Sequence, residues 1–266
     1  MHRHVALLTD FGLEDPYVGQ MKGALAMHGP CVPVVDLCHH VAPYNTLQAG
    51  FILRASYAHF PPGTVFVNVV DPGVGGDRRI VILEALDRFF LAPDNGLLTM
   101  MLDASPSCRA HSVDMSHFPR ASCTFHGRDI FAPLAVRLAL GAAPDVLAQA
   151  IDPAGLVRLD NAQAKATPYG AMAHVAHVDR FGNCLLNMDI ATWEEKLAST
   201  RTLRMGNGPA FRLATTYASL NPGEVGFIAG SQGVMELAMG QASAAERLNL
   251  SLGDTLNLHF DSGGIS

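Results

Sequence analysis

The sequence predicts two domains: an N-terminal α/β domain over residues 1–155 with a mostly parallel sheet, and a smaller all-β, barrel-like C-terminal domain over residues 168–266. Strand-like and helix-like segments alternate through the first part, which is typical of a parallel sheet covered by helices. Short strand-like runs between turns dominate the second part, as in small sandwiches and barrels. The length of 266 residues accommodates two domains of ordinary size.

Turn signals set the bounds of the elements expected in the N-terminal domain. An apolar run at 4–8 ends in Thr9-Asp10-Phe11-Gly12 and indicates a buried strand, and the branched run TVFVNVV at 64–70 gives the strongest strand signal. Helical spacing over 17–27 ends just before a Gly-Pro pair, a common helix terminator. The other expected elements are strands at 32–37, 79–85 and 89–91 and helices at 46–59, 95–102 and 129–140.

The segment 152–169 shows little periodicity and is predicted to link the domains. Beyond it, short apolar runs alternate with turn residues, and one helix-like stretch at 192–197 interrupts them. Strands of this length and spacing favour a small sandwich or barrel. They are expected at 171–178, 184–188, 211–216, 224–229, 234–238 and 255–260.

Composition excludes several classes of protein. Hydrophobic residues make up 49% and charged residues 16%, which supplies a core and argues against a disordered chain. A net charge of −6 disfavours nucleic acid as a partner. The apolar runs fall short of the roughly 18 residues that a membrane helix needs, and no secretory pattern is present. The five cysteines are odd in number and form no C-x-x-C pair, so we expect free thiols in a cytoplasmic protein.

Polar residues that follow the predicted strands are the first candidates for a site, because ligands bind beyond the carboxyl ends of strands in open parallel sheets. Asp10 follows the first strand, Tyr44-Asn45 lies beyond the second, and Asp71 follows the third. The segment His126-Gly127-Arg128-Asp129 precedes the last helix of this domain. Each of these residues also suits a turn or a helix cap, since Asp and Asn readily form local hydrogen bonds.

Two familiar ligand motifs are absent. The glycine-rich loop at 71–79 leads from strand to strand and lacks G-x-x-x-x-G-K-[ST], so it does not fit a phosphate-binding loop. The first strand–helix junction lacks G-x-G-x-x-G, which disfavours a dinucleotide site.

Twelve histidines raise the question of a metal hydrolase. Candidate ligands are His39-His40 with Asp36, and His174 and His177 with Asp179. Neither group forms H-E-x-x-H, and His174 and His177 would face opposite sides of a strand. Solvated histidines are therefore the favoured interpretation, and no metal is expected.

Six motifs occur in one order along nearly the whole chain. They are T-D-F-G-x-x-D-x-Y-V-G-x-M-K-G from Thr9, V-D-P-G-V-G from Val70, A-P-D-N-G-L-L from Ala92, F-H-G-R-D-I-F-A-P from Phe125, V-D-R-F-G-N from Val178 and S-x-G-x-x-E-L-A from Ser231. This combination resembles the S-adenosylmethionine hydroxide adenosyltransferase family, the adenosine-forming S-adenosylmethionine hydrolases related to fluorinase and chlorinase. The resemblance implies an α/β domain, a barrel-like domain, and a homotrimer with active sites between domains of neighbouring subunits.

The resemblance also implies a reaction, the hydrolysis of S-adenosyl-L-methionine to adenosine and L-methionine without a metal or other cofactor. Activated water would attack the 5′ carbon of the ribose in line with the departing sulfur. The water-activating trio of the family carries over onto Asp71, Arg78 and His126. Asp71 and His126 can accept a proton and Arg78 can stabilise hydroxide, and the sequence does not decide which of the two acceptors holds the proton.

Roles in substrate binding follow from the same resemblance. Asp10 would accept hydrogen bonds from the ribose hydroxyls, with the ring of Tyr44 against the sugar. Asn183 would recognise the adenine edge together with backbone groups around Met239.

The methionine part of the substrate would lie in the last motifs. Asp179 would bind its ammonium group and Ser231 its carboxylate, and Glu236 lies in the same segment. Where halogenating relatives carry Arg beside that serine, this chain has Gln232, so the neutralisation of the carboxylate is left open.

The chain departs from the fluorinase pattern at the residues that hold fluoride. Asp71 and Val74 stand where fluorinase has Tyr and Thr, and His126-Gly127 stands where it has Tyr-Ser. The fluorinase insertion is also absent between residues 76 and 92. Fluoride use is therefore disfavoured, and the alternatives are a chlorinase-like, halide-dependent adenosyl transferase and a nucleoside-binding sensor with little turnover.

Overall fold

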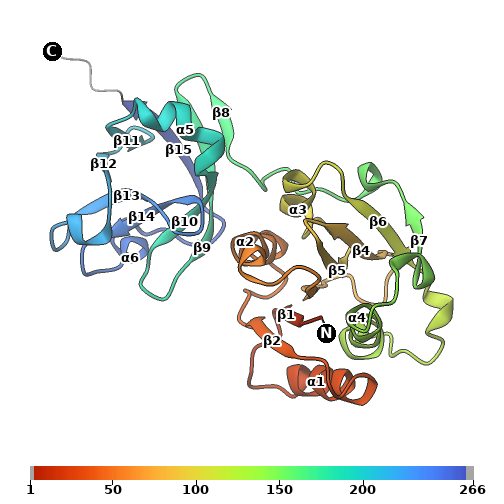
Figure 1. The fold of residues 1–266 in the computed structure, drawn as a ribbon. Coiled ribbons are helices and arrows are strands. Elements are labelled where there is room, and N and C mark those ends of the chain that lie inside the picture. The colour runs from red at the N-terminus through yellow and green to blue at the C-terminus, as the bar shows by residue number, and fades with distance from the viewer. Residues whose placement is uncertain (1–2, 262–266) are drawn as a thin grey trace, which may run out of the picture. The chain divides into compact units, whose positions relative to one another are not determined.

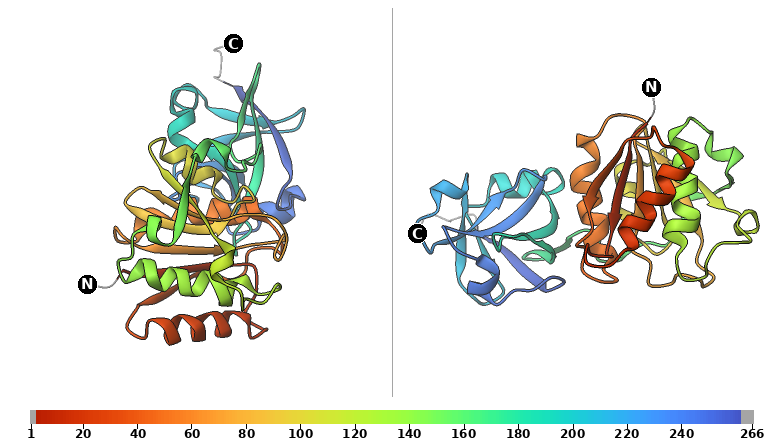
Figure 2. Two further views of the ribbon diagram at one scale, coloured as in Figure 1. Left: turned by 90° about the vertical axis from the view of Figure 1, so that its right-hand side faces the viewer. Right: turned by 90° about the horizontal axis from the view of Figure 1, so that it is seen from below.

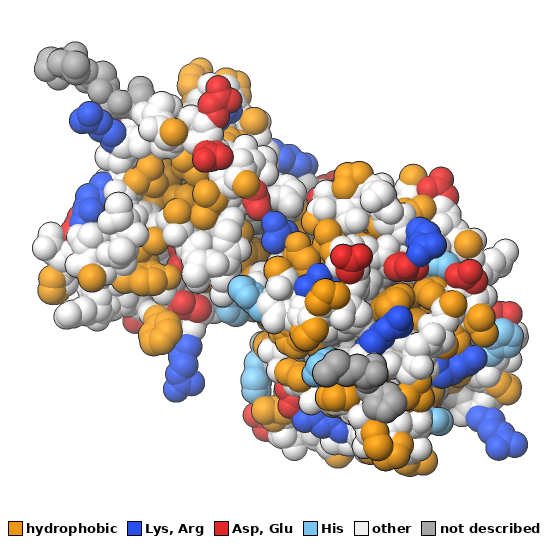
Figure 3. Space-filling model, viewed as in Figure 1, with side chains coloured by type: hydrophobic (Ala, Val, Ile, Leu, Met, Phe, Trp, Pro, Cys, Tyr) orange, Lys and Arg blue, Asp and Glu red, His pale blue; other side chains and the backbone are white. Residues whose placement is uncertain are grey.

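The computed structural model describes residues 3–261 (Figure 1). The chain divides between Leu159 and Asp160 into two compact units, here called the N-terminal and C-terminal units. Within residues 3–261, no helix combines the length and the apolar character required to cross a membrane. On the face drawn in Figure 3, the Lys and Arg side chains are scattered among acidic and apolar ones.

A seven-stranded sheet forms the centre of the N-terminal unit, with strand order β2-β1-β3-β5-β4-β6-β7. The strands β2, β1, β3 and β5 are parallel, whereas β4 runs against β5 and β6, and β7 runs against β6. Most strands thus point one way, which confirms the expected mostly parallel sheet. The bounds are β1 (Val5–Thr9), β2 (Val34–Cys38), β3 (Val65–Val69), β4 (Ile80–Ala85), β5 (Arg88–Pro93), β6 (Arg109–Val113) and β7 (Ala148–Ile151).

The reversal at β4 has a local cause in the two residues that join it to β5. Leu86 and Asp87 both adopt positive φ, at 54° and 56°. Positive φ at both central residues is the property of a type I′ hairpin turn, which joins antiparallel neighbours. The chain therefore turns back at this point instead of crossing over through a helix.

Helices cover both faces of this sheet, with α1 and α4 on one side and α2 and α3 on the other (Figures 1 and 2). Their side chains bury every position of β1 and β3, as expected for strands covered on two faces. The bounds are α1 (Tyr17–His28), α2 (Thr46–Ser56), α3 (Thr99–Ala104) and α4 (Ala132–Ala139), with a π-helical turn η3 (Gly127–Phe131) before α4 and 3₁₀ turns η1 (Tyr57–His59), η2 (Met115–His117), η4 (Pro144–Val146) and η5 (Pro153–Gly155).

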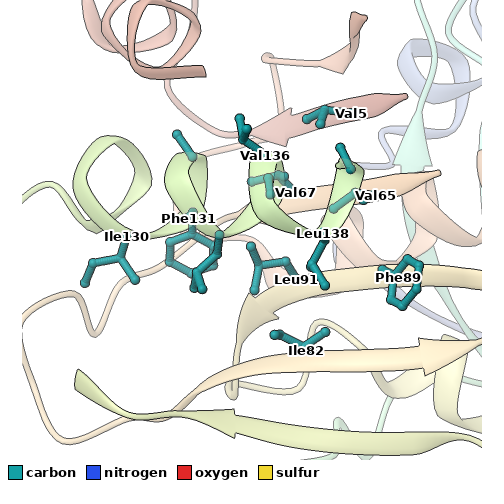
Figure 4. Packing of buried hydrophobic residues seen from close by; sticks show 14 of the residues in the cluster. Val5, Val65, Val67, Ile82, Phe89, Leu91, Ile130, Phe131, Val136 and Leu138 are labelled. Carbon is teal, nitrogen blue, oxygen red and sulfur yellow. The ribbon is translucent and has the colours of Figure 1, made fainter. Parts of the chain in front are cut away.

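The packing of α4 against the sheet fixes the start of that helix. Phe131, Val136 and Leu138 lie against Val67 and Leu91 of the strands (Figure 4), and all five belong to one buried cluster. Burying such side chains contributes about 1.5–3 kcal/mol each. His126, the residue just before the π-helical turn, is therefore held in place by a well-packed helix.

The C-terminal unit is a closed, mixed β-barrel with β8 paired outside it. The strands follow the order β10-β14-β13-β12-β11-β15-β9, and pairing of β9 with β10 closes the ring. This confirms the expected barrel-like all-β unit. Its elements are β8 (Lys165–Thr167), β9 (Gly170–Val178), β10 (Cys184–Asp189), α5 (Ile190–Ala198), β11 (Thr202–Met205), β12 (Ala210–Ala214), η6 (Tyr217–Ser219), β13 (Val225–Ala229), β14 (Val234–Met239), α6 (Ala244–Leu248) and β15 (Thr255–Asp261).

Candidate active site

A cavity of about 570 Å³ opens at the carboxyl ends of β1 and β3 in the N-terminal unit. Asp10, Tyr44, Asp71 and His126 line it. These residues come from four separate segments of the chain. The position agrees with the general rule for ligand sites in parallel sheets.

Arg78 bridges Asp71 and His126, the two groups for which the family resemblance implies a role in water activation. Its Nε lies 2.9 Å from Asp71 Oδ1 and 3.0 Å from Oδ2, and its terminal nitrogen donates to the same carboxylate. That terminal nitrogen also lies 2.7 Å from His126 Nδ1. The side chains of Arg78 and Asp71 are 11% and 5% exposed, so the ion pair is largely shielded from water.

The loop from Asp71 to Arg78 reaches His126 because it lies directly against the segment before it. Turns within the loop are closed by Val74 N donating to Asp71 O and Gly76 N donating to Gly73 O. Gly75 has φ +79°, and a Cβ there would lie only 2.4 Å from Cys123 O. Glycine at this position permits both the turn and the close approach.

The contact with Arg78 fixes the protonation pattern of His126. A guanidinium has only donors, so Nδ1 must accept, and the neutral ring carries its hydrogen on Nε2. Burial lowers the pKa of His126, and the Arg78 cation lowers it further, against the opposing effect of Asp71 and Asp129. At neutral pH His126 is thus a neutral ring that offers a donor at Nε2.

Asp10 is half-buried and receives the backbone of the next loop. Its Oδ2 accepts a hydrogen bond from Tyr44 N at 2.9 Å, and Tyr44 adopts a positive φ of 66°. Burial raises the pKa of Asp10, with the Tyr44 contact opposing that shift. Tyr44 presents its ring to the outside, since it is 71% exposed.

An aromatic wall that the sequence did not single out completes this cavity. Phe11, Tyr17 and Phe125 lie with ring centroids 5.4–5.9 Å apart. All three line the same cavity as Asp10 and His126. Each of these rings belongs to one of the motifs that carry the family resemblance. The motifs therefore contained this information, but a search for acidic, basic and nucleophilic residues did not identify the rings.

A second cavity, of about 670 Å³, lies in the C-terminal unit. Its lining brings together all the C-terminal residues predicted to bind substrate, which are Asp179, Asn183, Ser231, Glu236 and Met239. Among the described residues that line it, two are acidic and none is Lys, Arg or His. The predicted site residues thus fall into two groups, one in each unit.

Asp179 organises the turn that presents Asn183. Its Oδ1 accepts from the backbone N–H groups of Phe181 and Asn183, both at 2.9 Å. Its Oδ2 accepts from Asn183 Nδ2 at 2.9 Å. Asn183 can satisfy Asp179 with one amide hydrogen and still present its amide oxygen and its second N–H, the acceptor and donor that a purine edge requires.

Glu236 is held by a tyrosine from a neighbouring loop. Tyr217 donates its hydroxyl to Glu236 Oε2 at 2.5 Å, and Glu236 is only 3% exposed. Burial raises the pKa of Glu236, and the hydrogen bond from Tyr217 opposes that rise. The carboxylate occupies the space beside Gly230, where a Cβ would lie 1.8 Å from Oε1. Tyr217 is a further residue of this cavity that the sequence did not identify.

No group of three or more His, Cys, Asp or Glu side chains within residues 3–261 is arranged to hold a metal ion. Of the histidines weighed as ligands, His39 contacts Asp36 and Thr9, and His174 contacts Thr255.

Comparisons with known proteins point to one family. Residues 5–148 match the family model described as SAM hydroxide adenosyltransferase N-terminal domain, and residues 173–257 match the model of its C-terminal domain. An (R)-S-adenosyl-L-methionine hydrolase from Salinispora tropica is 36% identical over 96% of this chain and 97% of its own length.

Two further similarities are more distant in sequence. A fluorinase from Actinopolyspora mzabensis is 27% identical over 94% of each protein. The crystal structure of an uncharacterised conserved protein from Thermotoga maritima has a TM-score of 0.87 and 28% identity, and the match covers 96% of this chain and 99% of that one.

The close approach at Gly75 gives a testable consequence. Gly75→Ala places a Cβ against a backbone oxygen at positive φ, so we expect a loss of stability of about 1–3 kcal/mol, measured by thermal or denaturant unfolding. Gly73→Ala in the same loop is the matched control, because its Cβ would meet the nearest atom, Arg78 Cγ, at 3.4 Å. Equal stability of the two variants would contradict this account of the loop.

Proposed function

The chain belongs to the SAM hydroxide adenosyltransferase family, and from that premise we propose that it hydrolyses S-adenosyl-L-methionine to adenosine and L-methionine. Relatives at 36% identity carry the name of this hydrolase, and they match nearly their whole length. The single observation that supports the proposal most is the buried Asp71–Arg78–His126 arrangement at the cavity of the N-terminal unit. Acidic and imidazole groups of this kind suit the activation of water better than the binding of a halide anion.

The reaction makes its main demand on the nucleophile. The sulfonium loses its positive charge as the carbon–sulfur bond breaks, so the thioether leaves neutral and needs no general acid. Water, with a pKa of about 15.7, needs a base or a field that favours hydroxide. In this proposal side chains alone carry out the reaction, with S-adenosyl-L-methionine as the substrate and no cofactor.

The three side chains divide this work among them. His126 Nδ1 is occupied by Arg78, so the imidazole contributes a donor at Nε2 that orients the attacking water. Asp71 retains lone pairs beyond those directed at Arg78 and is the proton acceptor in this scheme. Arg78 stabilises the negative charge that develops on the oxygen. General base assistance supplies about 10²–10⁴-fold, so the positioning of water and substrate must supply much of the rest.

Substrate binding uses both units. In the N-terminal unit, Asp10 accepts hydrogen bonds from the ribose hydroxyls, and the exposed ring of Tyr44 lies against the sugar. In the C-terminal unit, Asn183 and the backbone near Met239 bind the adenine edge, and Asp179 binds the ammonium group of the methionine part.

The methionine carboxylate requires donors that do not carry charge. The lining of the C-terminal cavity holds Gln232 where halogenating relatives are expected to have Arg, and no cationic side chain among its described residues. We assign the carboxylate to the hydroxyl of Ser231 and the amide of Gln232. Glu236, tied to Tyr217, shapes this end of the cavity and does not face the carboxylate as a free anion.

The assembly and location follow from the same proposal. From the family resemblance we propose a homotrimer with active sites between the domains of neighbouring subunits. The division of the binding residues between the two units is compatible with such a site. The five cysteines are free, which supports a reducing compartment, and we propose the cytoplasm.

The decisive assay incubates the pure protein with S-adenosyl-L-methionine in heavy-oxygen water. We expect the label in the 5′ oxygen of the released adenosine, detected by mass spectrometry. Addition of chloride without formation of a chlorinated adenosine excludes the halide-dependent alternative. Tight adenosine binding with no labelled product would instead support a nucleoside sensor and contradict the proposal.

Removal of the central cation should separate catalysis from binding. Arg78→Ala deletes the group that stabilises the nucleophile, so kcat should fall by about 10²–10³-fold while adenosine affinity changes little. Steady-state kinetics and calorimetric titration measure the two effects. Arg137→Ala, an exposed arginine on α4, is the matched control and should leave both unchanged. Parallel losses of kcat and adenosine affinity in Arg78→Ala would indicate a fold defect instead.

The pH dependence should report the neutral state of His126. The ring accepts from Arg78 only when unprotonated, so kcat/KM should be constant at higher pH and fall as pH decreases through the His126 pKa. Because burial and Arg78 lower that pKa, the midpoint should lie below 6.5. His126→Asn keeps an acceptor near the Nδ1 position without titrating, and its residual activity should lose this acid limb. A midpoint at or above 6.5 in the wild type would contradict the assignment.

A further inference from the structure

A row of polar side chains runs from α1 to Thr9, the residue before Asp10, and none of them has a role assigned above. Lys22 Nζ donates to Asp36 Oδ2 at 2.6 Å, and Asp36 Oδ1 lies 3.1 Å from His39 Nε2. His39 Nδ1 lies 2.9 Å from Thr9 Oγ1. His39 is 4% exposed and Thr9 is fully buried, so the contact between these two side chains is closed to solvent.

The surroundings determine the direction of each contact. Asp36 Oδ1 lies 3.1 Å from His39 Nε2 without hydrogen-bonding geometry, and its negative charge favours the tautomer with the ring hydrogen on Nε2, which leaves Nδ1 as the acceptor. Thr9 then donates its hydroxyl hydrogen to Nδ1, and its oxygen accepts from Phe11 N at 3.3 Å. A hydroxyl at position 9 is therefore both donor and acceptor, and no apolar side chain can replace it in both roles.

These contacts join the loop after β1, which carries Asp10, to the segment after β2, which begins with His39. Gly12 N donates to His39 O at 2.8 Å, and Thr9 bonds to the ring of the same histidine. The pairing of β1 with β2 becomes irregular between Leu7 and Leu8, just before this point. The side-chain contact thus continues the link between the strands where their regular backbone ladder ends, with Asp10 held between Thr9 and Phe11.

We propose that Thr9 and His39 are positioning residues that hold the Asp10 carboxylate in place for the two ribose hydroxyls, and so set the preference for ribonucleosides over deoxyribonucleosides. The proposal rests on the proposed function, because it takes the ribose of the substrate as the ligand of Asp10. Neither side chain touches the ligand, and both act through the loop that carries Asp10. Two hydrogen bonds to one carboxylate require a fixed carboxylate, since a rotated group satisfies only one hydroxyl.

The test compares Thr9→Val with Thr9→Ser in the full chain. Valine keeps the shape and removes the hydroxyl, whereas serine keeps the hydroxyl and loses the methyl group. Calorimetric titration gives the affinities for adenosine and 2′-deoxyadenosine. The wild type should prefer adenosine by about ten- to a hundredfold, since a hydrogen bond to a charged group contributes that much. Thr9→Val should reduce this ratio to about threefold or less, mainly by weakening adenosine binding, while Thr9→Ser should retain it.

Two outcomes would overturn the proposal alone. One is an equal loss of affinity for both nucleosides in Thr9→Val, and the other is the same ratio in the Val and Ser variants. A wild type that binds no adenosine would overturn the proposed function as well, so the two failures are distinguishable. Steady-state kinetics should show that Thr9→Val raises the KM for S-adenosyl-L-methionine more than it lowers kcat.

A second pair of variants keeps the proposal testable if Thr9→Val does not fold. His39→Asn places an amide near the Nδ1 position and can still bond to Thr9, whereas His39→Gln extends its amide toward the Nε2 position. The ratio of adenosine to 2′-deoxyadenosine affinity should remain higher in His39→Asn than in His39→Gln. The reverse order, or equal ratios with equal melting temperatures, would show that the contact with Thr9 does not position Asp10.

Discussion

The hydrogen bonds of the Arg78 guanidinium are the constraint on which the N-terminal site depends. One cation bonds to a carboxylate and to an imidazole that come from different loops, and each bond requires the loops to meet. The loop after β3 meets the segment before η3 because Gly75 permits an approach that a side chain would block. The well-packed α4 then holds His126, the residue just before the π-helical turn. The hydrogen bonds of Arg78 can therefore form only because Gly75 and the packing of α4 first bring the two loops together.

The charge distribution follows the chemistry of the proposed reaction. The leaving thioether needs no help, so the cation is best placed at the nucleophile and not at the sulfur. Arg78 is bonded to Asp71 and His126, which line the N-terminal cavity. The described lining of the C-terminal cavity carries the acidic Asp179 and Glu236 without a basic side chain. An acidic cavity attracts the ammonium group of a cationic substrate. Burial raises the pKa of Glu236, and Tyr217 donates a hydrogen bond to its carboxylate.

Sequence reasoning predicted the fold class and placed Asp10 and Asp71 at the ends of strands, because those features have local signals. The other candidate site residues rested on the family resemblance. A polar residue directly after a buried strand, such as Asp10 or Asp71, is visible in the alternation of apolar and polar residues. The type I′ turn at Leu86 and Asp87 was not visible, since neither residue is typical of that turn. The contact of Tyr217 with Glu236 was also hidden, because it joins two segments that only the closed barrel brings together. Patterns within one segment do not specify contacts between segments.

The contact between His39 and Thr9 is another contact between segments that the sequence pattern does not specify. The sequence neighbourhood of His39 suggested either a solvated histidine or a metal ligand, and the structure shows a buried ring bonded to Thr9. Leaving such a buried polar group unpaired costs about 1–3 kcal/mol, and pairing it recovers little more than that cost. An apolar pair of the same shape would stabilise the sheet at least as well. The polar pair is therefore poorly explained by stability and better explained by geometry, since only directed hydrogen bonds fix the orientation of the loop that carries Asp10.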